Sequence, residues 1–76
     1  MKYVFTKYSY PISCWQIVKF HDDTSNGVLV NTSNNIPPHT IPGCLNDWCN
    51  MSGSFWQDFV YDSMEELVAE HFEVFL

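Results

Sequence analysis

The chain has 76 residues, of which 46% are hydrophobic, and this length is typical of one small domain spanning 1–76. Three Lys and no Arg face nine Asp and Glu, which gives a formal net charge of −6. Because DNA, RNA and anionic lipids are held chiefly by Lys and Arg, this balance argues against direct binding to nucleic acid or to a membrane surface. The same negative field attracts basic protein surfaces.

The first half of the chain predicts three strands. Residues 2–8 are rich in strand-favouring Tyr, Val, Phe and Thr. In residues 14–20, alternate side chains point to opposite faces of the strand, and neither face is purely polar. We therefore expect that strand to be covered on both sides near its middle. Residues 22–27 have turn chemistry, and 27–30 follow as the return strand. The second and third strands should therefore form an antiparallel hairpin.

The middle of the chain predicts a long loop over residues 31–54, because Pro37, Pro38, Pro42 and Gly43 oppose a long element there. A single helical turn is expected at 43–50. Residues 55–61 alternate in polarity and predict a fourth strand.

The C-terminal segment predicts the clearest helix. Ser63 and Glu66 have the spacing of a capping box. One apolar stripe follows at helical spacing: Met64, Leu67, Val68, His71, Phe72 and Phe75. The sequence therefore predicts an α+β fold, a small single domain with a three- to four-stranded, mainly antiparallel sheet. One C-terminal helix packs on it, and a long central loop interrupts it.

A metal site is one alternative for the loop. His39, Cys44 and Cys49 have the spacing H-x4-C-x4-C, and Cys14 or His21 could supply a fourth ligand to Zn²⁺. Paired C-x2-C knuckles, which mark strong zinc sequences, are missing, and buried cysteines beside an exposed His explain the pattern as well. We therefore assign no metal or cofactor. The odd cysteine count and the charged N-terminal segment predict a reduced protein in the cytosol.

Catalysis is not predicted. Cys44 or Cys49 could pair with a histidine, but no Lys lies near them in sequence to lower a thiol pKa. The sequence has no nucleophile elbow, phosphate-binding loop or paired-carboxylate motif. We expect a protein that is not an enzyme.

Two groups of side chains are candidates for partner binding. Six of the nine acids lie in the last nineteen residues: Asp58, Asp62, Glu65, Glu66, Glu70 and Glu73. Carboxylates near a helix end are unfavourable to the helix, which hints at a use for them, although a solvated outer face is the plainer explanation. Three indoles, Trp15, Trp48 and Trp56, belong to a set of thirteen aromatic residues that is too large for the core alone. They could form a contact surface or the rim of the core.

In size, acidity and absence of motifs, the chain resembles the small inhibitors that phages make against bacterial defence systems, anti-CRISPR proteins among them. It is similar in the same ways to the acidic immunity proteins that neutralise toxic nucleases. The resemblance rests on no specific residues. It implies a non-enzymatic inhibitor in the host cytosol that blocks a basic, nucleic-acid-binding surface of a protein partner. An immunity protein and a zinc-stabilised accessory module of a larger assembly are the alternatives.

Overall fold

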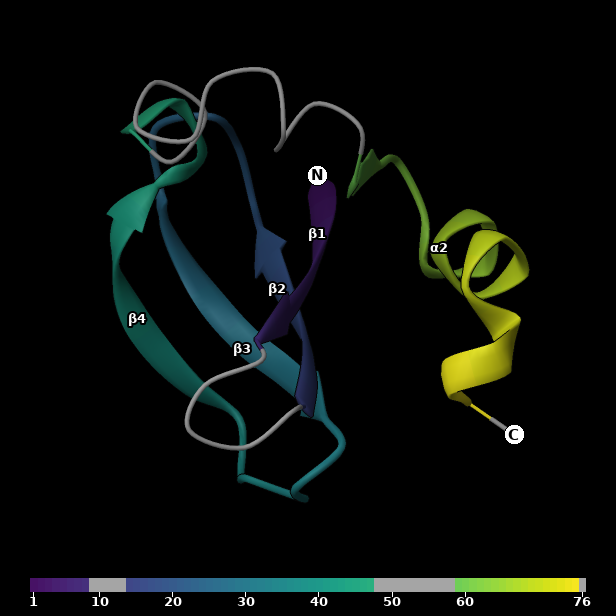
Figure 1. Ribbon diagram of the computed structural model, residues 1–76. Coiled ribbons are helices and arrows are strands. Elements are labelled where there is room, and N and C mark those ends of the chain that lie inside the picture. Colours follow the sequence, from purple (N-terminus) through teal and green to yellow (C-terminus); the bar gives the residue numbers. More distant parts are fainter. Residues whose placement is uncertain (9–13, 48–58, 76) are drawn as a thin grey trace.

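The computed structural model describes residues 1–8, 14–47 and 59–75, and Figure 1 shows their arrangement. The strands are β1 (Lys2–Tyr8), β2 (Cys14–Phe20), β3 (Asn26–Thr32), β4 (His39–Cys44) and β5 (Val60–Tyr61). Helix α2 (Met64–Glu70) and the short 3₁₀ helix η2 (Phe72–Val74) follow. The strands form one antiparallel sheet in the order β4-β3-β2-β1-β5. The predicted α+β class is confirmed, with five strands.

The predicted hairpin of the second and third strands is confirmed as β2–β3. Its turn depends on Asp22, whose carboxylate accepts hydrogen bonds from the Thr24 amide, the Thr24 hydroxyl and the Ser25 hydroxyl, each at 2.9 Å. These bonds hold the pKa of Asp22 at about 2, with the Thr24 amide as the largest cause. Polar side chains thus close this turn, whereas Gly27 lies buried within β3.

The region predicted as a loop over 31–54 contains β4, and this part of the prediction was wrong. Strand β4 is an edge strand, where the missing amide of Pro42 can face away from the sheet. The β3–β4 register shifts between Asn26 and Gly27, and Gly43 adopts a φ of 98° beside that shift. A helix begins immediately after β4, over residues 45–47. Proline and glycine are therefore accommodated by an irregular edge strand.

The fourth predicted strand is shorter than expected. Of residues 55–61, only Val60 and Tyr61 form a described strand, β5, which pairs with Val4 and Tyr3 of β1. Residue 59 lies in a 3₁₀ turn, and 55–58 lie outside the described residues. The short pairing still places the start of α2 beside β1.

Both faces of the sheet are buried at its centre, as the pattern of residues 14–20 predicted. Ile17 and Val18 are adjacent in sequence, point to opposite faces and are both fully buried. The Val18 face is built from Val4, Val18, Phe20, Leu29 and Leu45. The Ile17 face joins Phe5 and Ile17 to Leu67 of α2, with Tyr3, Trp15, Phe59, Tyr61, Met64 and Phe75 half-buried around them.

Helix α2 begins as predicted, because the Ser63 hydroxyl accepts a hydrogen bond from the Glu66 amide at 3.2 Å. The predicted stripe does not continue through Phe72, which is 58% exposed. The α-helix ends at Glu70, and His71 adopts φ −123° and ψ 31° before the tighter η2 turn. This change of winding turns Phe72 outward, while Val74 and Phe75 pack on the Ile17 face.

Candidate functional site

The predicted acidic residues lie along the outer side of α2 and η2. Glu65, Glu66, Glu70 and Glu73 are all exposed, and the last turn of α2 carries no basic residue. Leu67, on the opposite side of α2, is fully buried against the sheet. These four glutamates are called the acidic face below. Asp58 lies outside the described residues.

Asp62 differs from the acidic face because it has a cationic partner. The Lys2 ammonium donates a hydrogen bond to the Asp62 carboxylate at 2.5 Å. This hydrogen bond raises the pKa of Lys2 and lowers the pKa of Asp62, and the attraction of the opposite charges adds to both shifts. The pair is exposed and therefore adds little stability. Its main consequence is that the charge of Asp62 is largely compensated.

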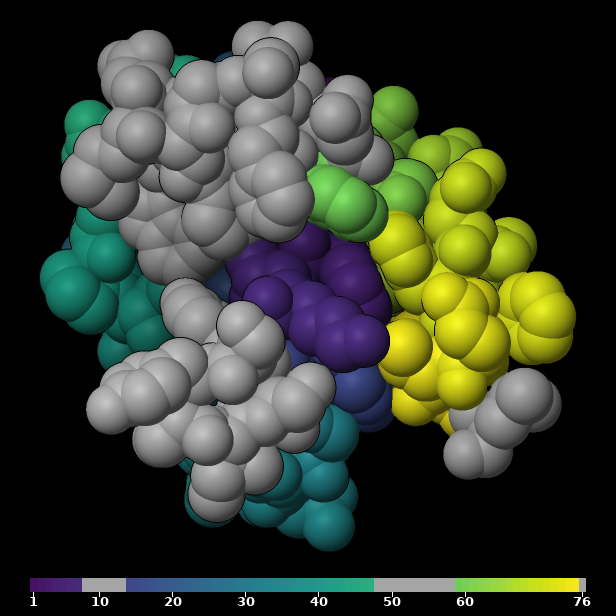
Figure 2. Space-filling model, in the orientation of Figure 1, coloured from purple at the N-terminus to yellow at the C-terminus, as the bar shows by residue number. Residues whose placement is uncertain are grey.

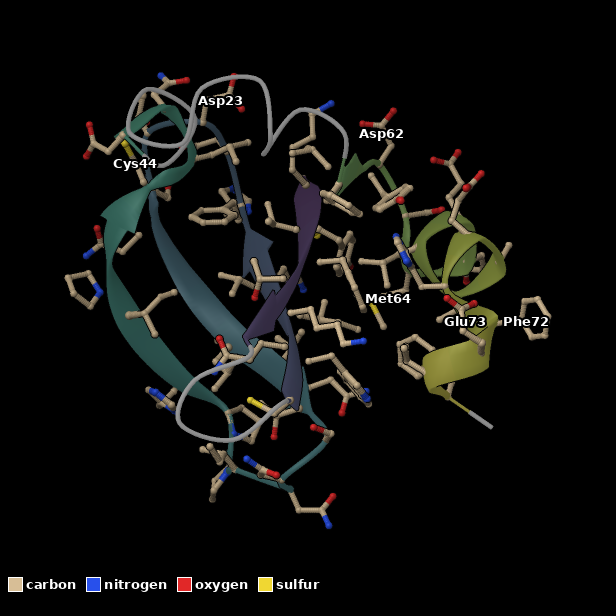
Figure 3. The ribbon with its side chains drawn as sticks, viewed as in Figure 1. Asp23, Cys44, Asp62, Met64, Phe72 and Glu73 are labelled. Carbon is tan, nitrogen blue, oxygen red and sulfur yellow. The ribbon has the colours of Figure 1, made fainter. Side chains whose placement is uncertain are left out.

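An apolar flank runs beside the acidic face. Val68 and Ala69 are adjacent on α2 and Phe72 follows at the start of η2, and a shallow depression is lined by Met64, Glu65, Val68 and Ala69. Figure 3 shows Phe72 extending away from the sheet, whereas Met64 points toward it. A large apolar ring next to carboxylates is the composition of an interface centre with a charged rim.

The predicted tryptophan surface is only partly described. Trp15 is half-buried on the Ile17 face, where its ring lies 4.7 Å from the ring of Phe75. It is paired with Lys7 across β1 and β2. Trp48 and Trp56 lie outside the described residues. The structure therefore does not place Trp15 on the outer side of α2 with the acidic face.

The sequence did not predict a cluster of three rings between β1 and the end of α2. The imidazole of His71 stacks on the ring of Phe5, with centroids 4.0 Å apart and an interplanar angle of 6°. Phe59 lies 5.5 Å from His71 and 6.3 Å from Phe5. Nε2 of His71 is hydrogen-bonded to the hydroxyl of Tyr61 at 2.7 Å, which fixes the imidazole in place.

These rings form the wall of a pocket of about 190 Å³, referred to here as the ring pocket. Phe5, Phe59, His71 and Val74 supply the apolar and aromatic lining, and Lys7 and Glu73 supply opposite charges. Lys7 and Glu73 are both exposed. Figure 2 shows β1, in purple, visible from outside between the green segment of β5 and the yellow C-terminal segment. Glu73 belongs to both the ring pocket and the acidic face, so the two are continuous.

Two sequence signals point to the ring pocket in hindsight. Phe5 and Lys7 are two residues apart on β1 and so share a face of the sheet. His71 follows the buried Leu67 by four residues and so shares its side of the helix. The contact between the two elements depends on how α2 crosses the sheet, which neither spacing specifies.

The metal and catalytic alternatives gain no support from the described geometry. His39 begins β4 and Cys44 ends it, and their β3 partners, Leu29 and Asn26, are three residues apart, or about 10 Å. Nδ1 of His39 lies 3.0 Å from the carbonyl oxygen of Pro37. Within residues 1–8, 14–47 and 59–75, no three His, Cys, Asp or Glu side chains are grouped to hold a metal ion. Cys14 and Cys44 are free thiols, and Cys49 is outside the described residues.

The comparisons with known proteins add no relative. No protein-family model matches the sequence, and neither a curated protein nor a solved structure is significantly similar to the chain. No helix in the described part of the chain is long and apolar enough to cross a membrane. Function must therefore be argued from the surfaces themselves.

Proposed function

We propose that this protein is a non-enzymatic inhibitor that binds a basic surface of another protein through the acidic face and Phe72. The observation that carries the proposal is the position of four exposed glutamates beside an exposed phenylalanine ring. Exposed apolar patches that are rimmed by polar residues mark protein interaction sites. An apolar anchor gives affinity, and the surrounding charges give steering and register.

The positions of two of these glutamates are unfavourable for the stability of the helix, which supports a role for them in binding. Glu70 and Glu73 lie at the C-terminal end of the helical segment, where backbone carbonyl groups already concentrate negative charge. A helix selected for stability alone would carry Lys or Arg there. Binding to a basic partner offsets this repulsion.

The spacing of the carboxylates supports a nucleic-acid-binding surface as the target. A rise of ~1.5 Å per residue in α2 and ~2 Å in the 3₁₀ segment gives ~13.5 Å of axis from Glu65 to Glu73, or an average of ~4.5 Å of axis between successive carboxylates. One strand of DNA carries a phosphate about every 3.4 Å of axis. A surface built to neutralise phosphates would therefore meet a similar linear charge density on this helix, and covering that surface would inhibit it.

The first experiment is a comparative capture from a cytosolic extract, using the immobilised protein. One variant combines Glu70→Lys with Glu73→Lys. A matched control combines Asp23→Lys with Asp47→Lys, which changes the net charge equally at exposed positions away from α2. The partner should be captured by the parent and the control but not by the helix variant. Equal capture by all three proteins would exclude the acidic face as the docking surface.

A further inference from the structure

We infer that the ring pocket receives one neutral aromatic side chain of the protein partner. This inference rests on the proposed function, because it names a second contact of the same docking event. It begins from the volume of about 190 Å³. Cavities for drug-sized ligands and nucleotides occupy about 300–1,000 Å³, whereas a cavity of ~150 Å³ holds a benzene ring. The ring pocket therefore fits a single ring with a small substituent.

The lining of the pocket suits a ring. Phe5, Phe59 and His71 surround it, and aromatic pairs gain from offset or edge-to-face contacts at centroid distances of about 4.5–7 Å. The hydrogen bond between Tyr61 and His71 and the stack on Phe5 already hold His71 in place. An entering side chain therefore meets a wall that is ordered beforehand, which lowers the entropic cost of binding.

The charges at the pocket decide between a neutral ring and a cation. A partner with a basic surface could also insert an arginine, and Glu73 alone would favour it. Lys7 also lines the pocket, and its ammonium opposes a second cation there. Because Lys7 and Glu73 bring one positive and one negative charge to the pocket, its lining has no net formal charge, and the ring contacts determine the occupant. Glu65, Glu66 and Glu70 of the acidic face do not line the pocket and remain available to the partner's basic residues.

The test uses small molecules that represent side chains and does not require the partner. p-Cresol represents tyrosine, and n-propylguanidinium represents arginine. Each is titrated into the labelled protein while the methyl and aromatic NMR signals are recorded. We expect p-cresol to give saturable shifts at Val74, Phe59 and His71 and none at Leu29, which lies on the Val18 face. We expect no saturable shift with n-propylguanidinium.

Two variants test the location of binding. Val74→Phe fills the pocket and should weaken p-cresol binding at least tenfold, whereas Ile36→Phe, at an exposed position that lines neither depression, should leave it unchanged. If Val74→Phe does not fold, Lys7→Trp obstructs the pocket from an exposed strand position and should weaken binding in the same way. If p-cresol binds Val74→Phe and Lys7→Trp as tightly as it binds the parent, the ring pocket is not its binding site.

Three outcomes overturn the inference: no saturable shift with p-cresol, saturation by n-propylguanidinium in its place, or shifts spread over both faces of the sheet. The proposed function fails separately. If p-cresol does not bind but the Glu70 and Glu73 reversal abolishes capture, only the pocket assignment is lost. If p-cresol binds as expected but the reversal captures the partner normally, the acidic face is not the docking surface.

Discussion

The two faces of the sheet are built differently. The five residues that define the Val18 face are each no more than 5% exposed, and four of them are aliphatic. On the Ile17 face three residues are buried, and the aromatic side chains around them are half-buried. The small helical segment covers the Ile17 face incompletely and leaves the ring pocket beside it. The Val18 face thus serves mainly stability, and the Ile17 face combines stability with a surface for binding.

The largest losses of stability are expected from substitutions of the fully buried side chains on each face. Phe20→Ala on the Val18 face should cost about 3–5 kcal/mol, and Leu67→Ala on the Ile17 face about 2–5 kcal/mol. Either loss is similar to the whole stability of so small a domain, about 3–5 kcal/mol. Phe72→Ala is the control and should change stability by less than about 0.5 kcal/mol, because that ring is exposed. Thermal unfolding compares them, and a stable Leu67→Ala protein would refute the packing of α2.

The tight packing of the Val18 face can be tested by adding one methyl group. A Cβ at Gly27 would lie 2.6 Å from Cγ1 of Val18 and 2.8 Å from Cε1 of Phe20. Both neighbours are fully buried, so Gly27→Ala should destabilise the protein by about 1–3 kcal/mol. Chemical denaturation measures this. An unchanged midpoint would mean that the Val18 face has room to adjust.

Two buried threonines, Thr6 on β1 and Thr32 on β3, test how much a buried hydroxyl contributes when it has hydrogen-bond partners in the described part of the chain and when it has none there. The Thr32 hydroxyl accepts hydrogen bonds from the amides of Asn34 and Ile36, so Thr32→Val should cost about 1–3 kcal/mol. Among the described residues, the Thr6 hydroxyl is buried without a hydrogen-bond partner. Thr6→Val keeps the shape and should therefore be neutral or stabilising by up to about 1 kcal/mol. Denaturant unfolding should therefore show that Thr32→Val lowers the free energy of unfolding and that Thr6→Val does not. Equal losses of stability would show that the Thr6 hydroxyl has a hydrogen-bond partner.

The smallest effect concerns the exposed β2–β3 turn, outside both faces. The pKa of Asp22 is about 2 in the folded protein, below the ordinary value of 3.8. A lowered carboxyl pKa contributes stability above the unfolded value, and this contribution is lost as the pH falls from about 3.8 toward 2. Carboxyl NMR titration should give a midpoint near 2, and Thr24→Ala should raise it. A midpoint that Thr24→Ala leaves unchanged would contradict the role of that hydroxyl.

Much of the fold was predictable from local patterns. The alternation in 14–20 indicated burial on both faces, and Ser63 with Glu66 marked the start of α2. Local patterns failed at β4, because Pro42 opposes a central strand but is tolerated at an edge, and edge position is a tertiary property. They also failed at Phe72, since its helical spacing assumed that the α-helix continues past Glu70.

Of the candidate surfaces, the acidic face was predictable from the sequence and the ring pocket was not. Exposed glutamates on α2 followed from the helical spacing that placed Leu67 inward. The partner of Asp62 did not, because Lys2 is sixty residues away and meets it through the β1–β5 pairing. The ring pocket depends on a similar long-range contact between Phe5 and His71. The distribution of charge along a helix can be read from the local sequence. The pairing of a charge with a distant residue and the shape of a pocket depend on how the sheet and the helix assemble.

The most direct measurement of the central claim is a titration of the purified partner against three proteins at two salt concentrations. The parent and the Asp23→Lys, Asp47→Lys control should bind tightly at about 0.05 M salt and about tenfold or more weakly at 0.5 M, because salt screens exposed charges. The Glu70→Lys, Glu73→Lys variant should bind at least about tenfold more weakly than the control at low salt. Equal affinities for all three proteins, independent of salt, would contradict the account and leave the acidic face as a solvated surface.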